Sequence, residues 1–256
     1  MGKAIYKAAG KANEYSEWAC NFYNGCSGMC SYCFNRLCRY KHILGGDKPT
    51  LKKMLIDEKE AFKIFKKEAM LNCQEIKKSG LFFSFVSDPC LPQTISLNIK
   101  AIHFCDEFLI STTLLTKQTW WLNEIPLFPK STKIGMTLTG HNEFEPNCAR
   151  NENRISTLKY LKKEGYKTWA SIEPVIDFES SCKMIAQSFD CVSHYKIGLL
   201  KGKSFFRKDI EMFIISVHQL LKDSGITIYW KDNILQQSEI TRNRLPENCV
   251  EKNFNF

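Results

Sequence analysis

Apolar segments of two kinds alternate along the chain. Short, nearly continuous apolar runs predict buried strands, as in residues 81–86 between Gly80 and Pro89. Longer segments with apolar residues at helical spacing predict helices. The predicted strands cover residues 18–23, 81–86, 108–113, 133–138, 167–172, 194–197 and 227–230. The predicted helices cover residues 57–78, 95–104, a short stretch from 116, 155–161, 180–189 and 206–222. Residues 5–17 and 37–50 show no clear period and are expected to be irregular.

A strand followed by a helix, repeated six times, predicts an α/β fold with a parallel sheet. Such a sheet is either open and doubly wound, or a barrel or partial barrel, and periodicity alone does not separate these. No G-x-G-x-x-G motif follows the first strand, so the dinucleotide-binding form of the doubly wound sheet loses its main support.

Three cysteines follow the first predicted strand at a C-x3-C-x2-C spacing: Cys26, Cys30 and Cys33. Small residues between them let the backbone curl, so the three thiolates are expected to converge on one soft metal centre. A structural zinc site usually has four protein ligands, and Cys38 as a fourth ligand keeps that alternative open. The other interpretation is an iron–sulfur cluster with one open iron.

With Tyr32 before the third cysteine, the motif C-x3-C-x-aromatic-C resembles the signature of the radical S-adenosylmethionine (SAM) superfamily. The resemblance implies that Cys26, Cys30 and Cys33 hold a 4Fe-4S cluster and that SAM chelates the fourth iron. An electron from a flavodoxin- or ferredoxin-like donor would then allow SAM to be cleaved to methionine and a 5′-deoxyadenosyl radical. It also implies a partial (β/α)6 barrel, with SAM at the carboxyl ends of the strands.

Polar residues stand where the predicted strands end, which is where a parallel barrel keeps its catalytic groups. Ser87, Asp88, Lys117, Thr137 and Glu173 are the candidates for contacts with SAM or for positioning a substrate, and Tyr32 is expected beside the adenine. Any one of these residues also fits a plain structural role. Asp88 before Pro89, for example, is a typical helix N-cap.

A closer resemblance, over about residues 4–200, is to the spore photoproduct lyase-like branch of the superfamily. Its motifs here are Gly10 to Tyr15, Ser87 to Pro92, Thr116-Lys117, Met136 to Leu138, Glu145-Pro146 with Arg154, and Ser171 to Ile176. The lyases carry a hydrogen-donor cysteine where this chain has Phe85, so photoproduct repair is not expected. Cys90 lies just beyond and is the candidate hydrogen donor.

Composition supports one domain over residues 1–256, with a core at about 18–200 and an extension at about 201–256. No apolar run of 18 residues and no apolar signal segment occur, so we expect a cytoplasmic protein without a membrane partner. In such a chain cysteines stay reduced, and those standing singly are expected to fill the core. These are Cys20, Cys73, Cys105, Cys148, Cys182, Cys191 and Cys249.

The formal net charge of +9 favours nucleic acid or another anionic partner, although many lysines also fit solvated helix faces. The expected function is therefore a radical SAM enzyme that abstracts a hydrogen atom from an unidentified, nucleic-acid-related substrate. Two alternatives are a nucleic-acid-binding protein with a structural metal site and a cluster-bearing sensor or electron carrier. The sequence leaves the substrate, the fate of SAM and the oligomeric state open.

Overall fold

The computed structural model describes residues 4–37, 41–124, 128–252 and 254. Its main element is an eight-stranded sheet in the order β1-β2-β5-β6-β7-β8-β9-β10. The strands of this sheet are β1 Ile5–Lys7, β2 Trp18–Cys20, β5 Leu81–Phe83, β6 Thr112–Thr116, β7 Lys133–Thr137, β8 Lys167–Val175, β9 His194–Leu199 and β10 Thr227–Trp230. A second sheet pairs β3 Tyr23–Asn24 with β4 Thr50–Leu51. Only β1 runs antiparallel to its neighbour in the large sheet.

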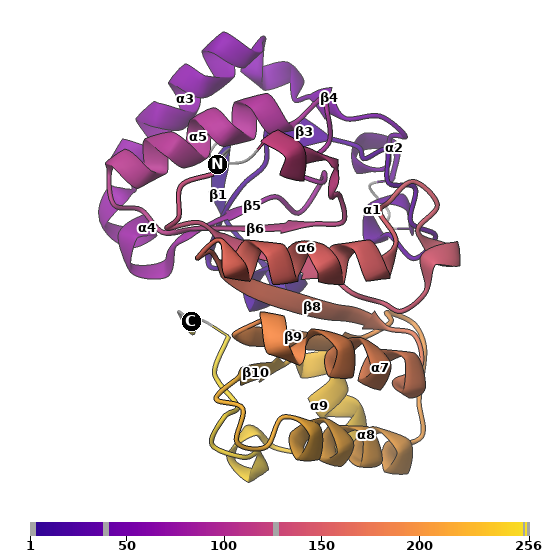
Figure 1. Cartoon of the computed structure of the whole chain (residues 1–256). Helices are drawn as coiled ribbons and strands as arrows, with labels where there is room; N and C mark the ends of the chain where they lie inside the picture. Colours follow the sequence, from indigo (N-terminus) through magenta and orange to yellow (C-terminus); the bar gives the residue numbers. More distant parts are fainter. Residues whose placement is uncertain (1–3, 38–40, 125–127, 253, 255–256) are drawn as a thin grey trace.

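Most of the parallel strands are connected by helices, and the long helices α3, α5, α6, α7 and α8 lie alongside the sheet in chain order (Figure 1). The α-helices are α1 Phe34–Leu37, α2 Lys41–Leu44, α3 Glu58–Leu71, α4 Cys73–Ser79, α5 Ile95–Glu107, α6 Asn151–Lys163, α7 Phe178–Ser188, α8 Arg207–Leu220 and α9 Asp232–Ser238. The 3-10 helices are η1 Gly10–Glu14, η2 Lys53–Leu55, η3 Trp120–Glu124, η4 Asn142–Phe144, η5 Phe189–Cys191 and η6 Arg242–Arg244.

The parallel strands stand in the order in which they occur in the chain, from β2 to β10, and the order never reverses. A doubly wound sheet reverses its strand order at a switch point, and that point is where it binds ligands. This sheet is singly wound, as in a barrel, but β1 and β10 stay unpaired with each other. The expected α/β architecture with a parallel, singly wound sheet is confirmed, with β10 as a seventh parallel strand supplied by the predicted extension.

Several element boundaries differ from the prediction for local reasons. The predicted strand at 18–23 stops at Cys20, because Asn21 turns its side chain to the backbone N–H of Phe85 at 2.8 Å. The predicted helix at 57–78 is divided at Asn72, whose side-chain amide donates to the Glu68 carbonyl at 2.8 Å. Leu109 has a positive φ of 57°, so the chain turns there and β6 begins only at Thr112.

In the part of the chain that the structure describes, no helix is long and apolar enough to span a membrane.

Candidate active site

A cavity of about 480 Å³ opens at the carboxyl ends of the parallel strands. Side chains from β5, β6, β7, β8 and the segments after β9 and β10 line it together with the cysteine loop. It brings together nine residues singled out from the sequence: Cys26, Cys30, Tyr32, Cys33, Ser87, Asp88, Lys117, Thr137 and Glu173. The strand-end argument therefore identified one side of a single cavity.

The cysteine loop is held against a second backbone segment where it begins. Gly25 has a φ of +79°, and a Cβ there would lie 2.4 Å from the Lys48 carbonyl oxygen, so the turn requires glycine. The next residue, Cys26, donates its backbone N–H to the Gly46 carbonyl at 2.9 Å. The backbone N–H of Gly28 donates to the Cys26 sulfur at 3.4 Å. These contacts fix the first thiol beside the cavity.

Burial and the nearby Asp88 carboxylate raise the pKa of the Cys26 thiol to about 11. Cys30 behaves in the opposite way, because a hydrogen bond from Cys148 lowers the pKa of the Cys30 thiol. The two sulfurs lie 3.8 Å apart. The interpretation of Cys148 as core filler is wrong, since its side chain lines the cavity.

Tyr32 is anchored by a buried ion pair. Its hydroxyl donates to Glu145, and Glu145 pairs with Arg154 at 2.7 Å with both side chains fully buried. Arg154 also donates to the Thr137 carbonyl at 2.8 Å and to the Ala149 carbonyl at 2.7 Å. The segment between β7 and α6 thus ties the cysteine loop to the carboxyl end of β7.

Asp88 is not the helix N-cap that its position before Pro89 suggested, because α5 begins at Ile95 and has Thr94 as its N-cap. Its carboxylate joins two loops instead. One carboxylate oxygen accepts from the Thr116 hydroxyl at 2.7 Å and the Cys90 N–H at 2.9 Å. The other oxygen accepts from the Lys117 N–H at 2.8 Å. The carboxylate therefore joins the end of β6 to the loop after β5, and it faces the cavity from there.

Lys117 and Ser87 line the same cavity and offer it an ammonium group and a hydroxyl. The Lys117 ammonium lies 5.6 Å from the centre of the Tyr32 ring. The Ser87 hydroxyl is buried and has no hydrogen-bond partner within the described residues. A buried hydroxyl without a partner is costly, and an occupant of the cavity that accepts or donates a hydrogen bond would remove that cost.

Glu173 is paired with a buried lysine that follows β10. Its oxygens accept from the Lys231 ammonium at 2.8 and 2.9 Å, and the Tyr15 hydroxyl also donates to it. The same ammonium lies 3.4 Å from Glu14 and 4.5 Å from the Tyr15 ring centre. Lys231 is only 2% exposed, and these two carboxylates are its ion-pair partners.

Two predicted residues are not part of this arrangement. Cys90 is fully buried and is not among the residues that line the cavity. Its role as a hydrogen donor stays a prediction. Cys38, the fourth ligand of the zinc alternative, lies outside the described residues.

Other residues of the site were not singled out as such: Cys148, Lys231 and the Glu145–Arg154 pair. Glu145 and Arg154 were noticed as motif residues, but the motif does not reveal that they anchor Tyr32. Lys231 follows a segment that was predicted as a strand, and the strand-end rule extended to that segment would have found it. No local pattern distinguishes Cys148 from the other single cysteines.

The thiols of the cysteine loop are the candidate ligands for a metal group. Among the described residues, no three or more His, Cys, Asp or Glu side chains are placed to hold one metal ion. Cys26, Cys30 and Cys33 nevertheless line one wall of the cavity, and thiolates are the ligands that iron–sulfur clusters use. The predicted convergence of the three thiols on one centre is therefore not seen, while their chemistry and the unpartnered hydroxyl of Ser87 suit a cluster with a polar ligand beside it.

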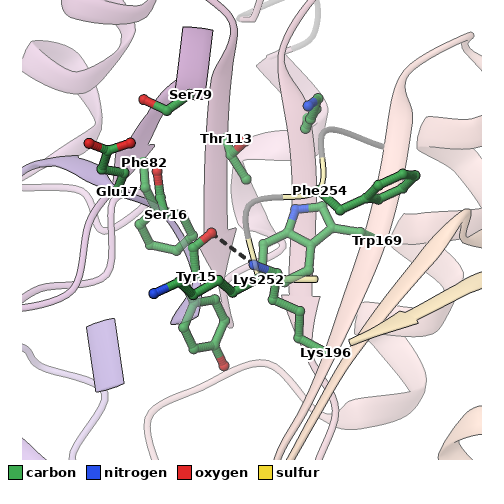
Figure 2. A pocket seen from close by; sticks show the side chains of 11 residues that line it. Tyr15, Ser16, Glu17, Ser79, Phe82, Thr113, Trp169, Lys196, Lys252 and Phe254 are labelled. Atoms are coloured by element: carbon green, nitrogen blue, oxygen red, sulfur yellow. Dashed lines mark hydrogen bonds between the residues drawn. The ribbon is translucent and has the colours of Figure 1, made fainter. Parts of the chain in front are cut away.

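A much smaller cavity, of about 30 Å³, lies at the amino ends of the strands (Figure 2). Lys133 and Thr113 line it from the start of β7 and β6. Lys196 enters it from β9, and its ammonium donates to the Tyr15 carbonyl at 2.8 Å. Its size suits about one water molecule, so it is no second substrate site.

No family model matches the chain. Among curated proteins, an uncharacterized protein of Methanocaldococcus jannaschii is 28% identical over 172 residues, which make up 63% of this chain and 61% of that protein.

Two of the solved structures that resemble this one are forms of spore photoproduct lyase. The form complexed with dinucleoside spore photoproduct has a TM-score of 0.58 and 15% identity, and the match covers 85% of this chain and 64% of that one. A mutant form has a TM-score of 0.55 and 14% identity, with 92% and 65% covered. The chain spans less than two thirds of the length of each of these relatives. At this level of identity the likeness shows the fold, and the chain has the fold of spore photoproduct lyase, a radical SAM enzyme.

Proposed function

We propose that this chain is a radical SAM enzyme that holds a 4Fe-4S cluster through Cys26, Cys30 and Cys33 and binds SAM in the adjoining cavity. The observation that supports this most is that the three thiols and the strand-end polar residues line one cavity. When bound, the reduced cluster supplies the electron that splits SAM into methionine and a 5′-deoxyadenosyl radical.

The chain's own residues have three tasks in this function. The Glu145–Arg154 pair and Tyr32 hold the cysteine loop in place. Ser87, Asp88 and Lys117 offer a hydroxyl, a carboxylate and an ammonium group to the polar parts of SAM. The apolar residues Phe82, Phe85 and Leu115 line the cavity and keep water from the reacting atoms.

The electron comes from an external flavodoxin- or ferredoxin-like protein in this proposal. The substrate is proposed to be anionic and related to nucleic acid, because Lys11, Arg36 and Lys201 are among the lining residues and the net charge is +9. A solved structure of the lyase that shares this fold holds a dinucleoside photoproduct. Phe85 in place of the lyase's donor cysteine still argues against photoproduct repair.

The test is SAM cleavage by anaerobically reconstituted protein. With dithionite and SAM, the wild type is expected to bind about four irons per chain and to release 5′-deoxyadenosine, slowly even without substrate. Cys26→Ala, Cys30→Ala and Cys33→Ala are each expected to lose both properties, because each removes a cluster ligand.

Cys182→Ala on α7 is the matched control and should keep iron and SAM cleavage. Protein that takes up stoichiometric zinc and no iron would instead favour the structural metal site. A replete, reduced cluster that leaves SAM intact would favour a sensor or electron carrier.

A further inference from the structure

A fourth thiol lies against the cysteine loop. The Cys148 sulfur, from the segment between η4 and α6, is 3.8 Å from the Cys30 sulfur and 3.6 Å from the Gly28 carbonyl oxygen. The first distance is within the range of a hydrogen bond between sulfurs, and Cys30 is only 8% exposed. The Cys30 sulfur therefore has Cys148 as a neighbour, largely shielded from water.

The backbone on both sides of this contact is fixed. Asn147 donates its backbone N–H to the Gly28 carbonyl at 3.4 Å and its side-chain amide to the Ser27 carbonyl at 2.9 Å. Ser31 donates its N–H to the Phe144 carbonyl at 2.9 Å. These hydrogen bonds lie on both sides of the two cysteines. The backbone therefore helps to hold the two sulfurs close together.

Gly28 makes room for the approach. A Cβ at this position would lie 3.1 Å from the Cys148 sulfur and 3.5 Å from the Cys26 sulfur. The first distance is tighter than an ordinary contact, and any larger side chain would push Cys148 away. Glycine at position 28 thus lets the Cys148 thiol lie beside the Cys30 thiol.

We propose that the Cys148 thiol donates an S–H···S hydrogen bond to the Cys30 thiolate and raises the reduction potential of the cluster. This inference rests on the function proposed above. A hydrogen bond to a ligand sulfur withdraws negative charge from the thiolate. It stabilises the reduced cluster more than the oxidised one, because the reduced cluster carries one more electron, and the reduction potential therefore rises. Cys148 is a positioning residue here and is not a cluster ligand.

The experiment is a redox titration of the reconstituted cluster, followed by electron paramagnetic resonance, in wild type and three variants. Cys148→Ala removes the donor and is expected to shift the midpoint potential to more negative values. Cys148→Ser keeps a hydrogen-bond donor and should return most of that shift. Cys182→Ala removes a distant thiol and should match the wild type. Iron content should be equal in all four proteins, because none of these changes removes a ligand.

Two results would overturn the inference while the proposed function stands. One is an equal midpoint potential in Cys148→Ala and wild type at equal iron content. The other is loss of iron in Cys148→Ala, which would make Cys148 a ligand. A wild-type protein without any iron–sulfur signal would overturn the proposed function itself, and the inference with it.

Discussion

At Lys196, burial and neighbouring charges act on a single ammonium group. Burial and the nearby charge of Lys231 lower the pKa of Lys196 to about 7, while the carboxylates of Glu14 and Glu173 act in the opposite direction. Its side chain donates to the Glu14 and Tyr15 carbonyls and is only 4% exposed. A lysine with this pKa is only about half protonated near pH 7.

This lysine makes stability depend on pH. In the unfolded chain its pKa is near 10.5, so between about pH 7 and 10.5 the unfolded chain binds the additional proton. The free energy of unfolding should therefore rise with pH in that window, by up to about 1.4 kcal/mol per pH unit. Urea unfolding of wild type and Lys196→Met from pH 6.5 to 9.5 measures this, because the variant lacks the contribution. Parallel curves for the two proteins would contradict the assignment.

At the scale of elements, the segment between β7 and α6 stabilises the cysteine loop. It contributes the carboxylate that accepts from Tyr32, the cysteine beside Cys30 and the carbonyl that accepts from Ser31. Arg154 is the first-turn residue of α6 that fixes this segment to β7. The position of the loop therefore depends on one buried guanidinium.

Arg154→Met should destabilise the fold by about 3 to 5 kcal/mol, because Glu145 would keep a buried charge without its partner. Arg207→Met is the matched control, since Arg207 pairs with Glu211 at 2.8 Å on an exposed face of α8. The control should lose less than about 1 kcal/mol. Both values come from urea unfolding. The double variant Glu145→Gln with Arg154→Met should recover part of the loss, and equal losses in the two single Arg variants would refute the role of the pair.

The strands and helices were predictable because each buried apolar run and each helical period is a local property. β8, β9 and β10 lie where the pattern placed them, whereas β1 at residues 5–7 was not predicted, because three residues carry too little alternation to show a period. In the site, the cysteine motif and the strand-end rule found the residues that line one wall. The contacts of Cys148 with Cys30 and of Lys231 with Glu14 were not predictable, since each joins residues more than 100 positions apart.

At the scale of the whole molecule, the chain carries 36 Lys and Arg residues against 27 Asp and Glu residues. The ion pairs of the site do not account for this positive excess. If this excess serves an anionic partner, binding to DNA or RNA should weaken steeply with added salt, because each counterion released from the nucleic acid gains less entropy in a more concentrated solution. Fluorescence anisotropy with a labelled oligonucleotide between 50 and 300 mM salt gives the slope. Absence of binding at low salt would remove nucleic acid from the proposed partners.

The contact of Lys231 with Glu14, Tyr15 and Glu173 has a consequence for the order of events during synthesis. Its contacts with Glu14 and Tyr15 join residues more than 200 positions apart, and Lys231, Tyr15 and Glu173 all line the cavity. A nascent chain that has emerged from the ribosome only as far as β9 carries all three loop cysteines but lacks Lys231. We therefore expect the cysteine loop to be more exposed to oxidation and to stray metal ions until β10 has been translated, so that insertion of the proposed cluster follows translation of β10.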